Sequence, residues 1–412
     1  MTEISRRGFL AAMGVAGGSL ALVGCSSGSS SSAKAAAETA RSTVSPYGPH
    51  QAGIATKSQD RLVFAAFDVT SNKRADLVSL LKTWSATIPR LTGGLQVVDD
   101  VESNPQLPPQ DTGEAVGLPP ANLTVTVGFG PSLFDNRFGL SARRPAALAD
   151  IPPIAHDNLN PAISNGDLCV QACADDPQVA FHAVRNLRRL AQGTAVLRWT
   201  QLGFGKTSST STTQATPRNL MGFKDGTNNI KAEDAGVFDD QVWVGAETDQ
   251  SWMRGGTYVV TRRIQMFLES WDRDFLEDQE NVIGRAKDTG APLGRTDEFE
   301  TVPLDAKHPS GDPLIPLDAH IRLASPLSND GHKLLRRGYS FTDGVHPQTG
   351  ELDAGLFFIA FQKDPRVQFV PIQRRLAQND ALNEYIQHTS SALFACPPGF
   401  EAGGMLGEAL FA

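Results

Sequence analysis

The chain is predicted to be an α+β protein built from two similar halves, residues 56–215 and 216–412. In each half, short apolar segments alternate with amphipathic ones in an order that fits β-α-β-β-α-β, the ferredoxin-like plan. Each half also contains a related hexapeptide, DPQVAF at 176–181 and DPRVQF at 364–369. We therefore expect a duplicated fold in which two antiparallel sheets pack face to face.

In the first half, RLVFAAFD at 61–68 predicts a strand that is followed by an amphipathic helix. The apolar face of that helix carries Leu77, Leu80, Leu81 and Trp84. The remaining elements are two strands, a helix and a final strand, expected at residues 123–130, 167–175, 177–192 and 195–204.

In the second half, the pattern predicts strands at 255–266 and 355–362, a helical stretch at 267–284 and a helix within 365–385. Both hexapeptides begin with Asp-Pro after a strand. Asp is favoured immediately before a helix and Pro in its first turn, so each is expected to open a helix. Two segments rich in Pro, Gly and Asp, 99–120 and 286–316, are predicted to be surface loops.

The N-terminus is predicted to be a targeting segment that does not belong to the fold. SRRGFL at residues 5–10 fits a twin-arginine export signal, and LVGC at 22–25 resembles a lipobox that would make Cys25 the lipidated residue. We therefore assign 1–24 to the signal and 25–55 to a flexible linker. The expected location is extracytoplasmic, with only a lipid anchor in the membrane. A chance arginine pair before a Sec-type signal, or ordinary cleavage and release, are the alternatives.

The overall charge and the remaining cysteines exclude several classes of protein. A formal net charge of −8 makes nucleic acid an unexpected partner. Cys169 and Cys173 are four residues apart on a predicted strand, hence roughly 13 Å apart, which is too far for a disulfide. We expect both to be buried thiols. The chain contains no C-x-x-C-H motif, which excludes covalent attachment of a c-type haem.

Three residues in separate motifs suggest a catalytic site. Asp225 lies in the glycine-flanked GFKDGTN (222–228), His320 in PLDAHIRLASP, and Arg336 in LLRRGYSF. A carboxylate can relay a proton, an imidazole can bind haem iron, and a guanidinium can stabilise developing negative charge. Each has a simpler explanation as well: Asp-Gly is a common turn, and Arg336 with Arg337 can be a solvated pair.

In this order and context, these residues resemble the DyP-type (dye-decolourising) haem peroxidases, in particular their exported deferrochelatase/peroxidase branch. The resemblance covers nearly the whole chain after about residue 55. It implies one non-covalent haem b in the C-terminal half, with His320 as the proximal ligand of the iron. Asp225 would be the distal acid, and Arg336 would assist cleavage of hydrogen peroxide. The oxidant, a ferryl intermediate, would then oxidise phenols, dyes or other one-electron donors.

Further contacts follow from the same resemblance. Arg263 is expected to replace a missing haem-contacting arginine, and Asp353 to hydrogen-bond the proximal imidazole. Tyr339 and Trp271 are candidates for surface oxidation of bulky donors, with structural packing as the alternative. The other expected haem contacts are Gly226, Thr227, Asn228, Ser325, Pro326 and Leu327, and the expected apolar wall is Leu356, Phe357 and Phe358.

Three other functions stay open at this stage. The chain can be a deferrochelatase that releases iron from haem, an anchored haem carrier without enzymatic activity, or a cofactor-free ferredoxin-like enzyme. The sequence decides neither the electron donor nor whether the protein is a homo-oligomer.

Overall fold

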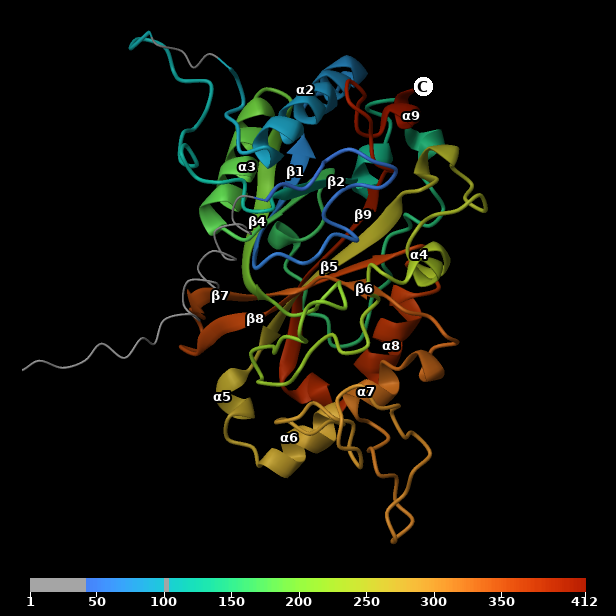
Figure 1. The fold of residues 1–412 in the computed structure, drawn as a ribbon. Helices are drawn as coiled ribbons and strands as arrows, with labels where there is room; N and C mark the ends of the chain where they lie inside the picture. Colours follow the sequence, from blue (N-terminus) through green and yellow to red (C-terminus); the bar gives the residue numbers. More distant parts are fainter. Residues whose placement is uncertain (1–41, 100–103) are drawn as a thin grey trace, which may run out of the picture. The chain divides into compact units, whose positions relative to one another are not determined.

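The computed structural model describes residues 42–99 and 104–412 (Figure 1). The predicted export signal, Cys25 and the first part of the predicted linker therefore lie outside the described residues. The last residues predicted as linker, 51–55, are packed on the fold: the buried Gln51 amide donates to the carbonyls of Val127 and Pro397 and accepts the Val127 N–H. Within the described range, no helix combines the length and apolarity needed to cross a membrane.

The first half folds into four antiparallel strands in the order β2-β3-β1-β4. Helices α2 and α3 contact each other and pack on β1, β2 and β3. The predicted strands and helices of this half are confirmed. Their bounds are β1 Arg61–Val69, α2 Arg74–Thr92, β2 Thr124–Phe129, β3 Leu168–Ala174, α3 Pro177–Leu190 and β4 Ala195–Lys206.

Local chemistry explains why these segments form. The Asp176 carboxylate accepts the N–H groups of Gln178 and Val179 and so caps α3, with Pro177 at the first helical position. Side chains of β1 alternate between the two faces of the sheet. Phe67 packs edge-on against Trp84 of α2 with the ring centroids 5.5 Å apart, whereas Phe64 lies in the cluster on the opposite face.

The second half contributes β5, which lies between β9 and β8, while β6 and β7 both pair with β8. The strands are β5 Thr257–Met266, β6 Leu335–Arg336, β7 Tyr339–Val345, β8 Leu352–Gln362 and β9 Ile386–Cys396. The helices are α4 Ala235–Gln241, α5 Leu268–Trp271, α6 Leu276–Ile283, α7 His320–Leu323, α8 Phe369–Asn379 and α9 Glu408–Phe411.

The predictions for this half need three corrections. The helical stretch 267–284 is divided into α5 and α6. The second Asp-Pro does not open a helix: the Asp364 carboxylate accepts the Arg366 N–H in a turn, and α8 begins only at Phe369. Strands β7 and β9 were not predicted, because polar residues such as Thr342 and Gln387 interrupt the apolar pattern that marks a strand.

The two groups of strands meet at both edges and across a common core. β4 pairs with β7, and Phe129 of β2 pairs with Ala395 of β9, so the described strands form one nine-stranded sheet. Inward-facing residues of both groups, including Phe64, Phe357 and Phe394, form a single buried cluster. The α+β class with antiparallel strands is therefore confirmed. Cys169 and Cys173 are buried free thiols in the same cluster, as predicted.

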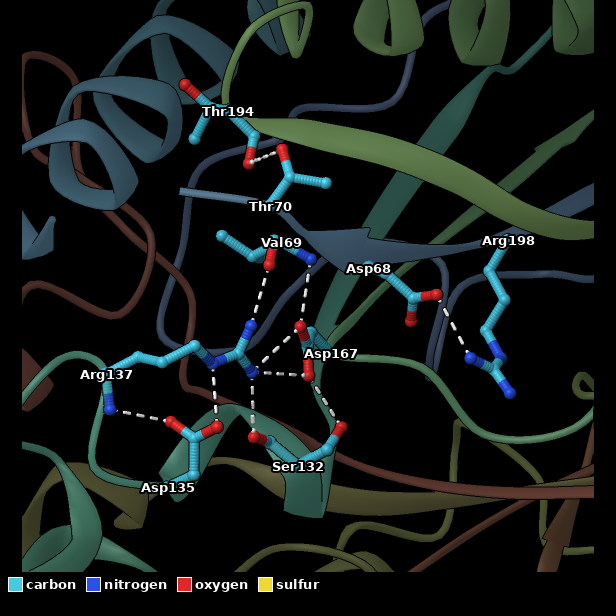
Figure 2. Close-up of polar contacts among 9 residues, drawn as sticks. All are labelled: Asp68, Val69, Thr70, Ser132, Asp135, Arg137, Asp167, Thr194 and Arg198. Atoms are coloured by element: carbon cyan, nitrogen blue, oxygen red, sulfur yellow. Dashed lines mark hydrogen bonds and ion pairs between the residues drawn. The ribbon is translucent and has the colours of Figure 1, made fainter. Parts of the chain in front are cut away.

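A polar network fixes the loop after β2 to the end of β1 (Figure 2). The Arg137 guanidinium donates to the Asp135 and Asp167 carboxylates and to the Val69 carbonyl. The buried Asp167 also accepts the Val69 N–H and the Ser132 hydroxyl. Because each charge is paired and hydrogen-bonded, this network stabilises the first half without providing a reactive group.

Candidate functional site

Most of the site residues predicted from the sequence line one pocket beside strands β5, β6, β8 and β9. Lining residues come from β5, β6, β8, β9, α6, α7 and α8, and they surround about 1450 Å³ of space that opens to solvent. On β5 and β8 the lining positions alternate with positions that face away, as strand geometry requires. The apolar part of the lining includes Ile264, Met266, Leu356, Phe358, Leu376 and Ile386.

The acidic loop owes its shape to glycine. Gly222 and Gly226 have φ angles of +84° and +85°, which favour glycine, and a Cβ on Gly226 would lie 2.9 Å from the Cα of Ser208. Asp225, the residue before Gly226, lines the pocket. Its Oδ1 accepts a hydrogen bond from Nη1 of Arg336 at 2.6 Å, and the two form an ion pair.

Arg336 lies on β6, and its backbone is clamped to the acidic loop. The Asn229 side chain accepts the Arg336 N–H at 2.8 Å and donates to the Arg336 carbonyl at 2.8 Å. Asn229 thus ties the segment that carries the acid to the strand that carries the guanidinium. The neighbouring Arg337 is fully buried and bonds to Gln59 and Thr56, so Arg336 is the pocket arginine, as expected.

His320 begins α7 and lines the same pocket. Its Nδ1 lies 2.6 Å from Oδ2 of Asp380, the residue that follows α8. Burial disfavours the charged imidazole, but the Asp380 carboxylate outweighs this effect and raises the pKa of His320. A carboxylate at Nδ1 holds the proton there and leaves the Nε2 lone pair for a metal.

Cations outnumber anions around the pocket. Lys224 pairs with Glu298, and Arg336 pairs with Asp225. The buried Arg285 instead donates to the carbonyls of Gly290 and Glu298, and no ion pair with a carboxylate is found for it in the described part of the chain. An apolar pocket with more cations than anions in its lining, together with an imidazole, suits a flat apolar cofactor that carries carboxylate groups.

Most of the predicted contacts line this pocket. They are Gly226, Thr227, Asn228, Ser325, Pro326, Leu356 and Phe358. Two are elsewhere: Leu327 is 76% exposed and is not in the lining, and Phe357 faces the inner cluster because it alternates with Phe358.

The predictions for Arg263 and Asp353 are wrong. Arg263 alternates with the pocket residue Ile264 and so faces away from the pocket, where its guanidinium binds Asp343 at 2.8 Å and Asp353 at 2.7 Å. Asp380, not Asp353, supports the imidazole of His320.

Tyr339 and Trp271 pack inside the protein, so the structural explanation holds for both. The Tyr339 hydroxyl donates to the Gln59 carbonyl, and the Trp271 indole N–H donates to the Met221 carbonyl. Both side chains are fully buried, which leaves neither at the surface for a bulky donor.

The sequence did not reveal Asp380, Asn229 or Arg285. Each acts through a contact with a residue that is distant in the chain or through a loop conformation. The only local signal was the position of Asp380, which precedes a helical turn and accepts the Leu382 N–H.

A supported imidazole in one pocket with an acid–guanidinium pair is the arrangement of a haem peroxidase site. Comparisons with protein families agree. Residues 51–205 match the Dyp-type peroxidase N-terminal domain and residues 216–401 the Dyp-type peroxidase C-terminal domain.

Relatives and solved structures support the same class. The chain is 39% identical to a deferrochelatase of Escherichia coli over 88% of this chain and 86% of that protein. It is also 39% identical to a dye-decolorizing peroxidase of Thermobifida fusca, over 98% of this chain and 97% of that protein. A DyP-type peroxidase structure from Streptomyces coelicolor superposes with a TM-score of 0.83 at 40% identity, covering 90% of this chain and 97% of that one. The chain belongs to the DyP-type peroxidase family.

Proposed function

We propose that haem b would lie in this pocket, in the second of two ferredoxin-like halves, and that His320 would hold its iron. As a DyP-type peroxidase, the protein uses haem to reduce hydrogen peroxide and to oxidise one-electron donors. The strand orders β2-β3-β1-β4 and β9-β5-β8-β7 support two ferredoxin-like halves with bounds near 56–215 and 216–412. The supported imidazole, the apolar walls and the excess of cations all fit the haem group.

When bound, haem would supply the redox-active iron for the reaction with peroxide and donors. The protein provides the proton transfer. Asp225 takes a proton from one peroxide oxygen and returns it to the oxygen that leaves. Arg336, held by Asn229 and paired with Asp225, stabilises negative charge on the departing oxygen.

The role of His320 can be tested by cavity rescue. We expect His320→Gly to weaken haem binding by at least about 100-fold, the upper end of the loss for removing a residue that merely supports a metal ligand. Added imidazole should restore the Soret spectrum by filling the space of the missing side chain. The measurement is a haem titration followed by absorbance, with His346→Gly on the exposed β7–β8 hairpin as control. Unchanged haem affinity and an unchanged Soret band in His320→Gly would exclude this ligand.

We also propose that the protein is exported by the twin-arginine route and anchored through lipid on Cys25. The motifs SRRGFL and LVGC support this, as does the serine- and alanine-rich stretch that follows Cys25 and is suited to a tether. Cys25→Ser should move the protein from the membrane fraction to the soluble fraction, as measured by fractionation with activity in both. The same distribution for wild type and variant would contradict anchoring at Cys25.

The name of the Escherichia coli relatives favours a second candidate function, deferrochelation. Peroxidase turnover and iron release have different products. Metal-free porphyrin and released iron after incubation with haem would support deferrochelation, whereas intact haem after many peroxide turnovers would support peroxidation alone.

A further inference from the structure

A second pocket lies near the haem pocket and takes no part in the function described so far. It surrounds about 1140 Å³ and is lined by Leu393 and Ser391 of β9, Arg262 of β5 and the segment that contains Asp157. Four prolines give it rigid apolar walls: Pro131, Pro152, Pro153 and Pro161. Ile151, Ile154 and Leu159 also belong to the apolar lining.

The polar lining of this second pocket consists of a buried ion pair between Arg262 and Asp157 and of Asp150, Ser164, Asn165 and Ser391. The Arg262 side chain is fully buried, and its two terminal nitrogens each bond to an oxygen of Asp157 at 3.0 Å. Two oxygens of a carboxylate offer about four acceptor positions, so Asp157 retains capacity for a further donor. The side chain of Asp157 is 11% exposed, which makes this capacity accessible from the pocket.

Two buried polar atoms beside the pair also lack partners in the described part of the protein. They are Nε of Arg262 and Nδ1 of His388. Burial, reinforced by the charge of Arg262, lowers the pKa of His388 to about 3, so the imidazole is neutral. Native proteins rarely leave such groups unsatisfied. Of the two residues, Arg262 lines the second pocket, so its Nε indicates a bound water or ligand there.

Only a thin wall of side chains separates the second pocket from the haem pocket. The Arg262 guanidinium lies over the ring of Phe369, 5.8 Å from its centroid. Phe369 in turn contacts Phe358, which lines the haem pocket, at a centroid distance of 6.3 Å. Along β5, Ile264 of the haem pocket is two residues from Arg262, or about 7 Å.

We propose that the second pocket binds a phenolic electron donor for the peroxidase reaction. This inference rests on the proposed haem site. The prolines and aliphatic side chains pack against the ring, and the phenol O–H donates to Asp157. Because Asp157 already neutralises Arg262, the pocket favours a neutral aromatic donor over an anion.

Oxidation of a phenol in this pocket accounts for one electron and one proton. The phenol loses one electron and the proton of its O–H bond, becoming a phenoxyl radical. The electron crosses the wall formed by Arg262, Phe369 and Phe358 to the cofactor already oxidised by peroxide. The proton passes to Asp157 and then to water at the open mouth of the pocket.

Narrowing the rim of the pocket tests the proposal without disturbing the ion pair. Leu159→Trp and Ile151→Trp add bulk at the lining, and Leu202→Trp is the control, since Leu202 is 57% exposed on β4 and lines neither pocket. Binding of 2,6-dimethoxyphenol to the resting haem-loaded protein is measured by calorimetry. Each lining variant should bind about tenfold more weakly, a loss of about 1.4 kcal/mol, with the control unchanged.

Steady-state kinetics separates this site from the haem pocket. In the lining variants the KM for 2,6-dimethoxyphenol should rise about tenfold, while the rate of reaction with peroxide stays at the wild-type value. Wild-type binding and KM in both variants would overturn the donor site. Wild-type peroxide kinetics with altered phenol binding cannot arise from a failure of the haem site, so the two hypotheses are tested separately.

Discussion

Asp225→Asn should slow the reaction of the haem-loaded protein with hydrogen peroxide by about 10²–10⁴-fold, the usual contribution of a positioned general acid–base group. An amide of nearly the same shape still accepts the hydrogen bond from Arg336 but cannot take a proton from peroxide. Haem binding should stay normal, because the proposed iron ligand, His320, lies on a different element. Rapid-mixing spectroscopy of the Soret band measures the rate directly.

Asp239→Asn is the matched control for this substitution. Asp239 is exposed on α4 and does not line the pocket, so the variant should react at the wild-type rate. If the Asp225→Asn protein reacted with peroxide as fast as wild type, Asp225 would not be the general acid–base group of this reaction. Such a result would favour the haem carrier that the sequence left open, because a carrier does not require the Asp225–Arg336 pair.

Arg336→Leu should reduce the same rate by about 10²–10³-fold, comparable to removing one donor from an oxyanion site. The guanidinium is 2.6 Å from Asp225, so the variant loses both the charge that stabilises the departing oxygen and the group that orients the acid. Arg336→Lys should react with peroxide at a rate between those of the wild type and Arg336→Leu, since an ammonium retains the charge without the planar donor geometry. The rate is again read from the Soret band after mixing with peroxide.

The double variant provides a sharper test of the pair. Residues that act as one unit give non-additive losses. Asp225→Asn combined with Arg336→Leu should therefore be slower than either single variant by much less than the product of their effects. Fully multiplicative losses would indicate two independent contributions, and an unaffected Arg336→Leu would assign the stabilising charge to another cation.

Much of the fold was predictable, because each element carries its own local signal. The continuous apolar run in RLVFAAFD and the Asp176–Pro177 cap each specify an element from a few neighbouring residues. The second Asp-Pro misled the prediction for a physical reason. The Asp364 carboxylate is taken by Arg366 in a turn, so it does not cap α8.

The site divides in the same way. Asp225, His320 and Arg336 lie in motifs distinctive enough to be recognised, and all three line one pocket. The supporting carboxylate was misassigned to Asp353, because the sequence contains no signal for a contact across sixty residues. Whether Arg263 lines the pocket of Asp225 and His320 depends on the face of β5 that its side chain occupies, and it lies on the other face.

By itself, the sequence determined the family resemblance, the secondary-structure signals of most strands and helices, and the three residues proposed to be reactive. These depend on neighbouring residues or short motifs, whose chemistry is local. Only the tertiary structure decided that Asp380 supports His320, that Asn229 clamps Arg336, and that Arg262 and Asp157 form a second pocket near the first. Such pairings depend on how strands and loops that are far apart in the chain pack together. Patterns among neighbouring residues contain no information about these long-range contacts.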